Sequence, residues 1–231
     1  MPLCQSIGSS VRSYIKANER LCLICNESLD TIHSLMDLSV FPSFLCASCR
    51  SKLKLHQKIY TIDGLQWHVL YEYDEFLERL FFRYKEQCDI LLAPVFLEAI
   101  QDSIDRFQKF TVCTLCSSNE KYMHRAFDPL KEIFLSWNIP TQSPFYKRKD
   151  HKQSQLSKDQ RQQVFKVLRK KEHYFLNSKN ILLADDVCTT GSTLRAAVSL
   201  VLPQYVFVLS AHPLWIEDHR QMVVEKKGLF W

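Results

Sequence analysis

The sequence predicts an α/β protein in which a parallel β-sheet is covered by helices and is preceded by a small four-cysteine module. After residue 64, stretches rich in strand-favouring residues alternate with helical stretches, and such alternation favours a parallel sheet covered on both faces. One stretch, residues 181–193, passes from an apolar run through two adjacent carboxylates into a loop of small hydroxyl residues. Two Cys-x-x-Cys pairs lie near the N-terminus.

The composition is that of a soluble globular protein. The 231 residues are 46% hydrophobic and 24% charged, which allows one domain of ordinary size plus a small module. No clean apolar run reaches the roughly 18 residues that span a bilayer. The first residues show no basic segment followed by an apolar core. We therefore expect a cytoplasmic protein with reduced cysteines, which would reach the inner face of the cell membrane only through partners.

Four cysteines have the spacing of a structural zinc site. The residues are Cys22, Cys25, Cys46 and Cys49. Two Cys-x-x-Cys turns separated by 20 residues can close a tetrahedron of thiolates around Zn²⁺. The metal would supply stability that so small a module cannot obtain from its own core. Two redox pairs or unconnected thiols are the alternative.

The chain divides into three parts on this interpretation. Residues 1–19 carry few apolar residues in any regular period and are expected to form a loosely attached leader. The cysteine module would cover residues 20–64, ending at Asp63-Gly64. Residues 65–231 would form the α/β domain with an aromatic C-terminal tail.

Hydrophobic periodicity assigns the elements of this domain. Apolar residues at i, i+1, i+4, i+5 and i+8 make a helical stripe over residues 76–84, whereas residues 67–73 are rich in strand-favouring side chains. In chain order we expect a strand at 67–73, helices at 76–84 and 90–107, a strand at 111–116, a polar loop at 117–121, helices at 122–137 and 157–171, and strands at 181–184 and 205–209.

The stretch at residues 181–193 carries the most specific chemical signal. Four apolar residues are followed by Asp185 and Asp186, and then by a loop that leads into a helix. The loop residues are Thr189, Thr190, Gly191, Ser192 and Thr193. Backbone N–H groups at a helix N-terminus lack intrahelical partners, so such a loop can bind a phosphate monoester. The two carboxylates can accept hydrogen bonds from a ribose diol or approach Mg²⁺. A ribose 5-phosphate unit is therefore the expected ligand, and an ordinary strand–turn–helix is the alternative.

This stretch looks like the phosphoribosyl pyrophosphate (PRPP) motif of the type I phosphoribosyltransferases. It follows the cysteine module, a Tyr-x-Tyr strand ending at Tyr73, a helix ending in Tyr84-Lys85 and an Arg-x-Phe element at Arg125. This order resembles the ComF family of competence proteins over residues 20–212. The resemblance implies a type I phosphoribosyltransferase fold behind a zinc module, with PRPP or a 5′-phosphorylated nucleotide in its pocket. It also implies a cytoplasmic factor of natural transformation that handles incoming single-stranded DNA beside the DNA-translocating helicase.

The chain departs from the family pattern in the region that would hold pyrophosphate. Where the family has an Arg-Gly-Phe-Asn-Gln run, residues 125–129 read Arg-Ala-Phe-Asp-Pro. Glu120 lies in the preceding loop, where its charge would repel an anion. Binding of a ribose 5-phosphate moiety is therefore better supported than transferase turnover. A Mg²⁺-dependent transferase acting on an unknown acceptor and a PRPP-sensing regulator both stay open.

The positive charge is concentrated in one segment. Residues 147–171 contain ten Lys or Arg and two Asp, a net of +8, whereas the whole chain carries +5. The candidate DNA-binding cations are Lys147, Arg148, Lys149 and Lys152. They adjoin Phe145 and Tyr146, on which bases could stack, so we expect this segment to bind single-stranded DNA. The alternatives are a lid whose cations neutralise PRPP and a solvated basic face.

Overall fold

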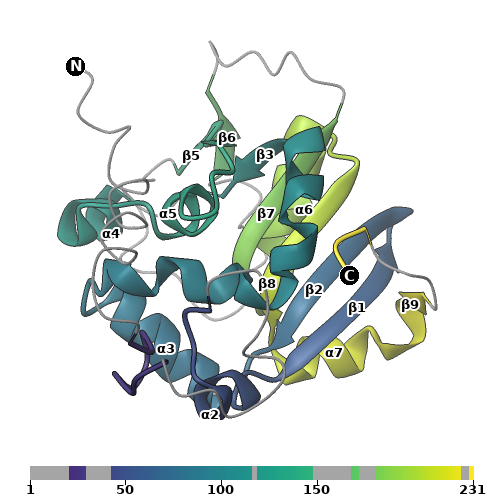
Figure 1. Cartoon of the computed structure of the whole chain (residues 1–231). Helices are drawn as coiled ribbons and strands as arrows, with labels where there is room; N and C mark the ends of the chain where they lie inside the picture. The colour runs from purple at the N-terminus through teal and green to yellow at the C-terminus, as the bar shows by residue number, and fades with distance from the viewer. Residues whose placement is uncertain (1–20, 30–42, 116–118, 148–167, 172–179, 225–228) are drawn as a thin grey trace, which may run out of the picture.

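A seven-stranded mixed sheet forms the centre of the protein (Figure 1). The computed structural model describes residues 21–29, 43–115, 119–147, 168–171, 180–224 and 229–231. In sheet order the strands are β4 (Thr141–Gln142), β3 (Thr111–Thr114), β7 (Ile181–Cys188), β8 (Tyr205–Ala211), β2 (Leu65–Glu72), β1 (Leu55–Ile62) and β9 (Val223–Val224). Neighbours from β4 to β2 pair in parallel, whereas β1 pairs antiparallel with both β2 and β9. The predicted α/β class is confirmed, with a mixed sheet that is mostly parallel.

Helical segments connect the strands and cover the sheet. They are α2 (Ala47–Ser51), α3 (Glu75–Lys85), η2 (Ile90–Lys109), α4 (Asn119–Arg125), α5 (Pro129–Leu135), α6 (Ser192–Val201), α7 (Pro213–Asp218) and η5 (Arg220–Met222). The η2 segment has 3-10 geometry with a kink at Ile100. In the described part of the chain, no helix combines the length and the apolar character that a membrane crossing requires.

Two hydrophobic cores lie on opposite faces of the sheet. Along β7, Leu182 and Ala184 pack in the first core, and Ile181 and Leu183 pack in the second. This alternation is the period-2 pattern of a strand buried on both faces. The first core contains side chains of α3, η2, α5 and the cysteine module, and the second contains side chains of α6, α7 and a hairpin formed by β5 (Phe145–Lys147) and β6 (Leu168–Lys170).

Aromatic residues near the C-terminus pack onto this body. Trp215 of α7 is 2% exposed and stacks near Trp67, with ring centroids 6.0 Å apart. Phe230 is fully buried, and its ring centroid lies 4.2 Å from that of Phe107. Arg106 donates a hydrogen bond to the Leu229 carbonyl at 2.8 Å. The last residues of the chain therefore complete the first core.

The predicted boundary at residue 64 falls in the tight turn between β1 and β2. Asp63 and Gly64 both have positive φ, of 51° and 78°, as two-residue hairpin turns require. The preceding residues 55–62 form β1 and pair with β2 along the same sheet. The division into a module and a domain stays a prediction, with β1 structurally continuous with the sheet.

The predicted helix over residues 122–137 is wrong in its extent, because two helices occupy this region. Ala126 has φ of 60°, which interrupts the helical backbone. Asp128 then caps α5, its side chain accepting from Lys131 N at 3.4 Å, and Pro129 occupies the first turn. Asp-Pro is a helix start signal, because the side chain satisfies a free N–H and proline has none to satisfy. The predicted polar loop over 117–121 is also shorter, since α4 begins at Asn119.

The predicted helix over residues 157–171 ends in a strand. Leu168–Lys170 forms β6 and pairs antiparallel with β5. Cross-strand pairing overrides the helical periodicity at this end of the segment. Residues 157–167 and the predicted leader at 1–19 lie outside the described residues.

Candidate ligand pocket and metal site

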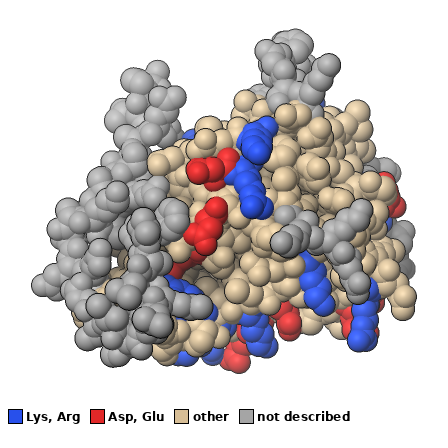
Figure 2. All heavy atoms as spheres, turned by 45° about the vertical axis from the view of Figure 1, so that its right-hand side comes forward, with Lys and Arg blue, Asp and Glu red and all other residues tan. Residues whose placement is uncertain are grey.

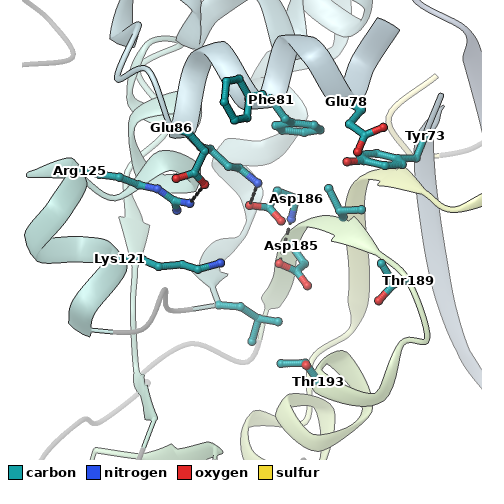
Figure 3. A pocket seen from close by; sticks show the side chains of 14 residues that line it. Tyr73, Glu78, Phe81, Glu86, Lys121, Arg125, Asp185, Asp186, Thr189 and Thr193 are labelled. Atoms are coloured by element: carbon teal, nitrogen blue, oxygen red, sulfur yellow. Dashed lines mark hydrogen bonds and ion pairs between the residues drawn. The ribbon is translucent and has the colours of Figure 1, made fainter. Parts of the chain in front are cut away.

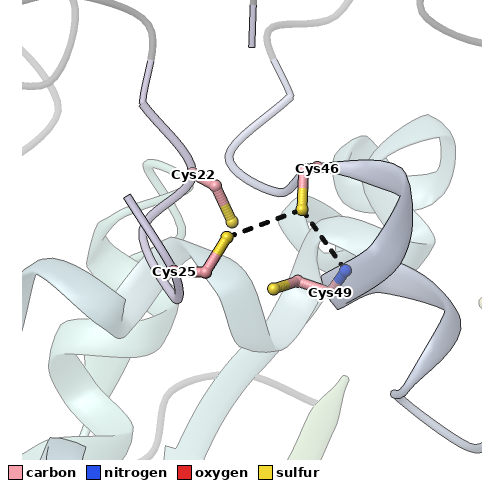
Figure 4. Close-up of side chains that lie close together, drawn as sticks. All are labelled: Cys22, Cys25, Cys46 and Cys49. Atoms are coloured by element: carbon pink, nitrogen blue, oxygen red, sulfur yellow. Dashed lines mark hydrogen bonds between the residues drawn. The ribbon is translucent and has the colours of Figure 1, made fainter. Parts of the chain in front are cut away.

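The four cysteines predicted to bind zinc lie together (Figure 4). The Sγ atoms of Cys22, Cys25, Cys46 and Cys49 all lie within 4.8 Å of one another. Cys25 Sγ and Cys46 Sγ are 3.7 Å apart. A tetrahedral zinc with Zn–S bonds of about 2.3 Å separates its sulfurs by about 3.8 Å. The cluster therefore fits Zn²⁺, and four protein ligands would make a closed structural site.

Local hydrogen bonds shape both cysteine turns. Asn26 N donates to Cys22 O at 2.8 Å, which closes the first turn. Cys46 is the N-cap of α2, and its Sγ accepts from Cys49 N at 3.4 Å. Leu23 N donates to the carbonyl of Phe44 at 3.0 Å and joins the two turns. The sulfurs are thus brought together by backbone geometry as well as by sequence spacing.

Polar contacts with η2 and α3 fix the cysteine module to the rest of the fold. Arg50 of α2 forms an ion pair with the buried Glu98 of η2, at 2.9 Å. Arg83 of α3 donates to the carbonyl of Ile24, in the first cysteine turn, at 2.8 Å. Lys85 lies two residues further along α3 and reaches the pocket described below. The candidate metal site and the pocket therefore share the C-terminal end of one helix.

The loop after β7 turns sharply into α6. Gly191 is the N-cap of α6 and has φ of 72°, a conformation that glycine adopts without steric cost. A Cβ atom at this position would lie 3.3 Å from Trp215 Nε1 and 3.5 Å from Trp67 Cζ3. The hydroxyls of Thr190 and Ser192 lie 2.9 Å apart and hydrogen bond across the turn. The strand–loop–helix arrangement thus matches the sequence motif.

A pocket of about 680 Å³ opens where the parallel strands end (Figure 3). Its walls include Tyr73 after β2, Leu115 after β3 and Val187 near the end of β7. Parallel α/β sheets bind ligands at this edge. Of the predicted ligand-binding residues, the pocket is lined by Asp185, Asp186, Thr189 and Thr193. The others, Thr190, Gly191 and Ser192, form the adjoining turn and are not part of the lining.

Charged side chains of both signs line the pocket. The acidic residues are Glu78, Glu86, Asp185 and Asp186, and the basic residues are Lys85, Lys121 and Arg125. Figure 3 shows Lys121 and Arg125 entering from α4, with Thr193 on the far side of Asp185. A ligand between these walls would have hydroxyls and a helix N-terminus at one end and cations at the other.

A close ion pair joins α3 to β7 inside the pocket. Lys85 Nζ lies 2.6 Å from Asp186 Oδ2, and the side chains are 15% and 28% exposed. Burial alone would raise the pKa of the Asp186 carboxyl, but the Lys85 ammonium outweighs it, helped by the backbone N–H of Val187 and the charge of Arg125. The pKa therefore lies below its ordinary value, and Asp186 is ionised at neutral pH. Asp186 N in turn donates to Asp185 Oδ1 at 2.9 Å.

Arg125 is a buried cation on the pocket wall. Its side chain is 5% exposed and forms an ion pair with Glu86. Its Nε has no hydrogen-bond partner among the residues that the structure describes. A buried donor without a partner is costly, so an anion that reached this wall would gain a strong charge-assisted hydrogen bond.

Cys188, at the end of β7, is a packing residue. Its side chain is 1% exposed, and burial together with the charge of Asp185 raises the pKa of the thiol to about 12. The thiol is therefore protonated at neutral pH. A protonated thiol that is closed off from solvent has no nucleophilic character.

The described part of the basic segment is a hairpin with one buried and one exposed ring. Phe145 is 1% exposed and packs in the second core, so its prediction as a stacking surface is wrong. Side chains alternate along a strand, and Tyr146 therefore points outward, 41% exposed. Its cross-strand partner is the exposed Arg169. Lys147 ends β5, and three predicted cations lie outside the described residues: Arg148, Lys149 and Lys152. On the face shown in Figure 2, described acidic and basic side chains are interspersed rather than gathered into one broad cationic patch.

Three basic pocket residues were not predicted as part of the site. Lys85, Lys121 and Arg125 come from α3 and α4, far from the motif in sequence. The sequence features that could have identified Lys85 and Arg125 are the Tyr84-Lys85 and Arg125-x-Phe127 elements. These elements contributed to the family resemblance, but no function was assigned to their residues.

Comparison with known proteins gives one informative relative. The chain is 23% identical over 209 residues to the competence protein ComFC of Streptococcus pneumoniae (strain ATCC BAA-255 / R6). The match covers 78% of this chain and 92% of the relative. No protein-family model matches the chain. The extent of the match, nearly the whole of the relative, agrees with the order of motifs in the sequence and supports assignment of the chain to the ComF/ComFC family.

Proposed function

We propose that this protein serves in competence, where it handles incoming single-stranded DNA together with the DNA-translocating helicase, and that its pocket binds a ribose 5-phosphate unit. The similarity to a competence protein supports the general role. The observation that carries the ligand proposal is the pocket of about 680 Å³ at the carboxyl ends of the parallel strands, lined by Asp185, Asp186, Thr189 and Thr193. PRPP and 5′-phosphorylated nucleotides are the candidate ligands.

The chemistry of the pocket suits the two ends of such a ligand. The phosphate would accept hydrogen bonds from the N–H groups and hydroxyls around Gly191, where the N-terminus of α6 favours an anion. A ribose diol would donate to the carboxylate of Asp185. Zinc at the four cysteines would have a structural role and take no part in this chemistry.

A Mg²⁺-dependent phosphoribosyltransferase acting on an unknown acceptor is the second candidate function. It is favoured by Lys121 and Arg125, which line the pocket beyond Asp185 and could meet the pyrophosphate of PRPP. Release of pyrophosphate from PRPP during incubation with candidate acceptors would support this candidate. A PRPP-sensing regulator would bind the same ligand without consuming it.

The proposed function is tested with a panel of three ligands at two salt concentrations. The ligands are PRPP, 5′-phosphorylated single-stranded DNA and the same DNA with a 5′-hydroxyl. If the protein binds PRPP but has the same affinity for the 5′-phosphorylated and the 5′-hydroxyl DNA, the DNA binds outside the pocket. Tighter binding of the 5′-phosphorylated end, with competition by PRPP, would place the DNA end inside it. If none of the three ligands binds, the proposal is wrong.

Replacing Asp185 by Asn tests the role of the diol. We expect the affinity for ribose 5-phosphate to fall about tenfold, because hydrogen bonds to a charged group contribute about 1.5–3 kcal/mol. The affinity for 2-deoxyribose 5-phosphate, which lacks one hydroxyl, should fall less. Asp186 is left intact because its loss would leave Lys85 without its partner. Titration calorimetry measures both ligands.

The control for this variant is Glu78→Gln, which removes another pocket carboxylate from α3. If the carboxylates acted only by repelling the phosphate, both variants would bind ribose 5-phosphate more tightly. An unchanged or increased affinity in folded Asp185→Asn would exclude the diol role.

The basic segment is tested by separating charge from stacking. Replacing Lys147, Arg148, Lys149 and Lys152 by Ala should lower the affinity for single-stranded DNA. It should also reduce the slope of log affinity against log salt by about 0.7 for each lost phosphate contact. Tyr146→Ala should weaken binding by about 1–3 kcal/mol without changing the slope, because stacking releases no counterions.

The matched control is Tyr122→Ala, which removes a ring of similar exposure, 43%, from α4. Wild-type affinity and salt slope in the folded quadruple variant would show that these cations form a solvated face. If the quadruple variant instead loses only PRPP binding, the segment acts as a lid and the transferase candidate gains support.

A further inference from the structure

The Asp185–Asp186 pair already has a cation of its own. Lys85 Nζ lies 2.6 Å from Asp186 Oδ2, and both side chains are largely shielded from solvent. The same ammonium lies 4.3 Å from the centroid of the Phe81 ring, which adds a cation–π contact. Lys85 is thus fixed by two contacts at the strand end where the motif places its acidic pair.

This arrangement does not fit Mg²⁺ at the acidic pair. Mg²⁺ binds oxygen ligands at about 2.0–2.1 Å in near-ideal octahedral geometry and keeps several waters. At Asp186 it would have to displace the Lys85 ammonium or lie beside it against a like charge. Asp185 Oδ1 is also engaged, since it accepts from Asp186 N at 2.9 Å. One oxygen of each carboxylate is therefore already engaged, Asp186 Oδ2 by the Lys85 ammonium and Asp185 Oδ1 by a backbone N–H.

We propose that Lys85 takes the place of a divalent cation at the Asp185–Asp186 pair, so that the pocket binds a sugar phosphate without Mg²⁺. This inference rests on the proposed ligand class and specifies its form, a metal-free sugar phosphate. The ligand's negative charge would be balanced by protein cations, since Lys85, Lys121 and Arg125 all line the pocket. Lys85 is a positioning and specificity residue here, because it acts through Asp186.

The test compares wild-type protein with Lys85→Met in two assays. The first assay measures Mn²⁺ binding by electron paramagnetic resonance, with Mn²⁺ as the probe for a Mg²⁺ site. The second measures ribose 5-phosphate affinity by calorimetry, with Mg²⁺ and in buffer freed of metal by a chelating resin. A dissolved chelator is avoided, because it could remove zinc from the four cysteines.

Wild type should bind ribose 5-phosphate equally with and without Mg²⁺ and should show no tight Mn²⁺ site. Lys85→Met frees the acidic pair, so it should gain one Mn²⁺ site per chain. Its ribose 5-phosphate affinity should become about tenfold weaker without Mg²⁺, the size of a lost charge-assisted hydrogen bond. Lys85→Arg keeps the charge and should behave like wild type. Arg79→Met is the matched control, because it removes a positive charge from the exposed side of α3.

Two results would overturn the inference. One is a wild-type protein that requires Mg²⁺ for ribose 5-phosphate binding, and this result does not depend on whether any variant folds. The other is Mn²⁺ binding that is equally tight in wild type and in folded Lys85→Met. If wild type binds no ribose 5-phosphate in either buffer, the ligand proposal fails, and the Mn²⁺ comparison alone decides whether Lys85 replaces the metal.

Discussion

The double variant Cys22→Ser and Cys46→Ser should lose the bound zinc completely, whereas the wild type should contain one zinc per chain. The four sulfurs lie within 4.8 Å of one another, and the variant removes one ligand from each turn. Two remaining thiolates cannot complete a tetrahedron, and structural zinc sites owe much of their stability to the metal. Metal analysis of purified protein measures the zinc content.

Loss of the metal should also destabilise the fold. Cys22 and Cys49 are buried in the first core, which also contains α3, so disorder in the cysteine turns would expose apolar side chains. We therefore expect a lower melting temperature for the double variant. The control is Cys88→Ser, which replaces an exposed cysteine outside the cluster and should keep both zinc and stability. Zinc retained at one per chain in the folded double variant would exclude these ligands.

The features that were predictable from sequence are those encoded over short distances. The two cysteine turns are each closed within five residues, and their spacing alone indicated the cluster that the structure contains. The strand–loop–helix at β7 and α6 is likewise contiguous, and Gly191 has the positive φ that its place in the motif requires. In both cases residues that are neighbours in the sequence restrict the backbone enough for the local structure to be predicted from the sequence.

The basic side of the pocket could not be predicted, because it depends on tertiary packing. Lys85 and Asp186 are separated by 101 residues. The amphipathic pattern of a helix does not indicate with which distant carboxylate its last lysine will form an ion pair. Arg125 is the last residue of α4, where the positive φ of Ala126 ends the helix, and it meets the pocket through the packing of α4 in the fold. The wrong prediction for Phe145 has the same origin. The pairing of β5 with β6 buries Phe145 and leaves the neighbouring ring of Tyr146 exposed.

His68 makes the stability of the fold sensitive to mild acid. It lies fully buried in β2, and neither ring nitrogen has a hydrogen-bond partner among the described residues. Aromatic rings surround it, with those of Phe230 and Trp231 at centroid distances of 5.1 and 5.4 Å. Burial lowers the pKa of the imidazole from 6.5 to about 4. The folded protein therefore keeps His68 neutral in a pH range where the unfolded chain protonates it.

We expect the free energy of unfolding to decrease as the pH falls below 6.5, where the unfolded state binds the additional proton. Between pH 7.5 and pH 5 the contribution of His68 should fall by about 2 kcal/mol, and above about pH 7.5 it should be constant. His68→Phe fits an aromatic environment and cannot be protonated. Between pH 7.5 and pH 5 its free energy of unfolding should therefore decrease by about 2 kcal/mol less than that of the wild type. His56, whose pKa burial also lowers to about 4, is present in both proteins and cancels in the comparison. Urea unfolding at pH 7.5, 6 and 5 measures the difference, and parallel pH profiles for the two proteins would show that His68 is not the group responsible.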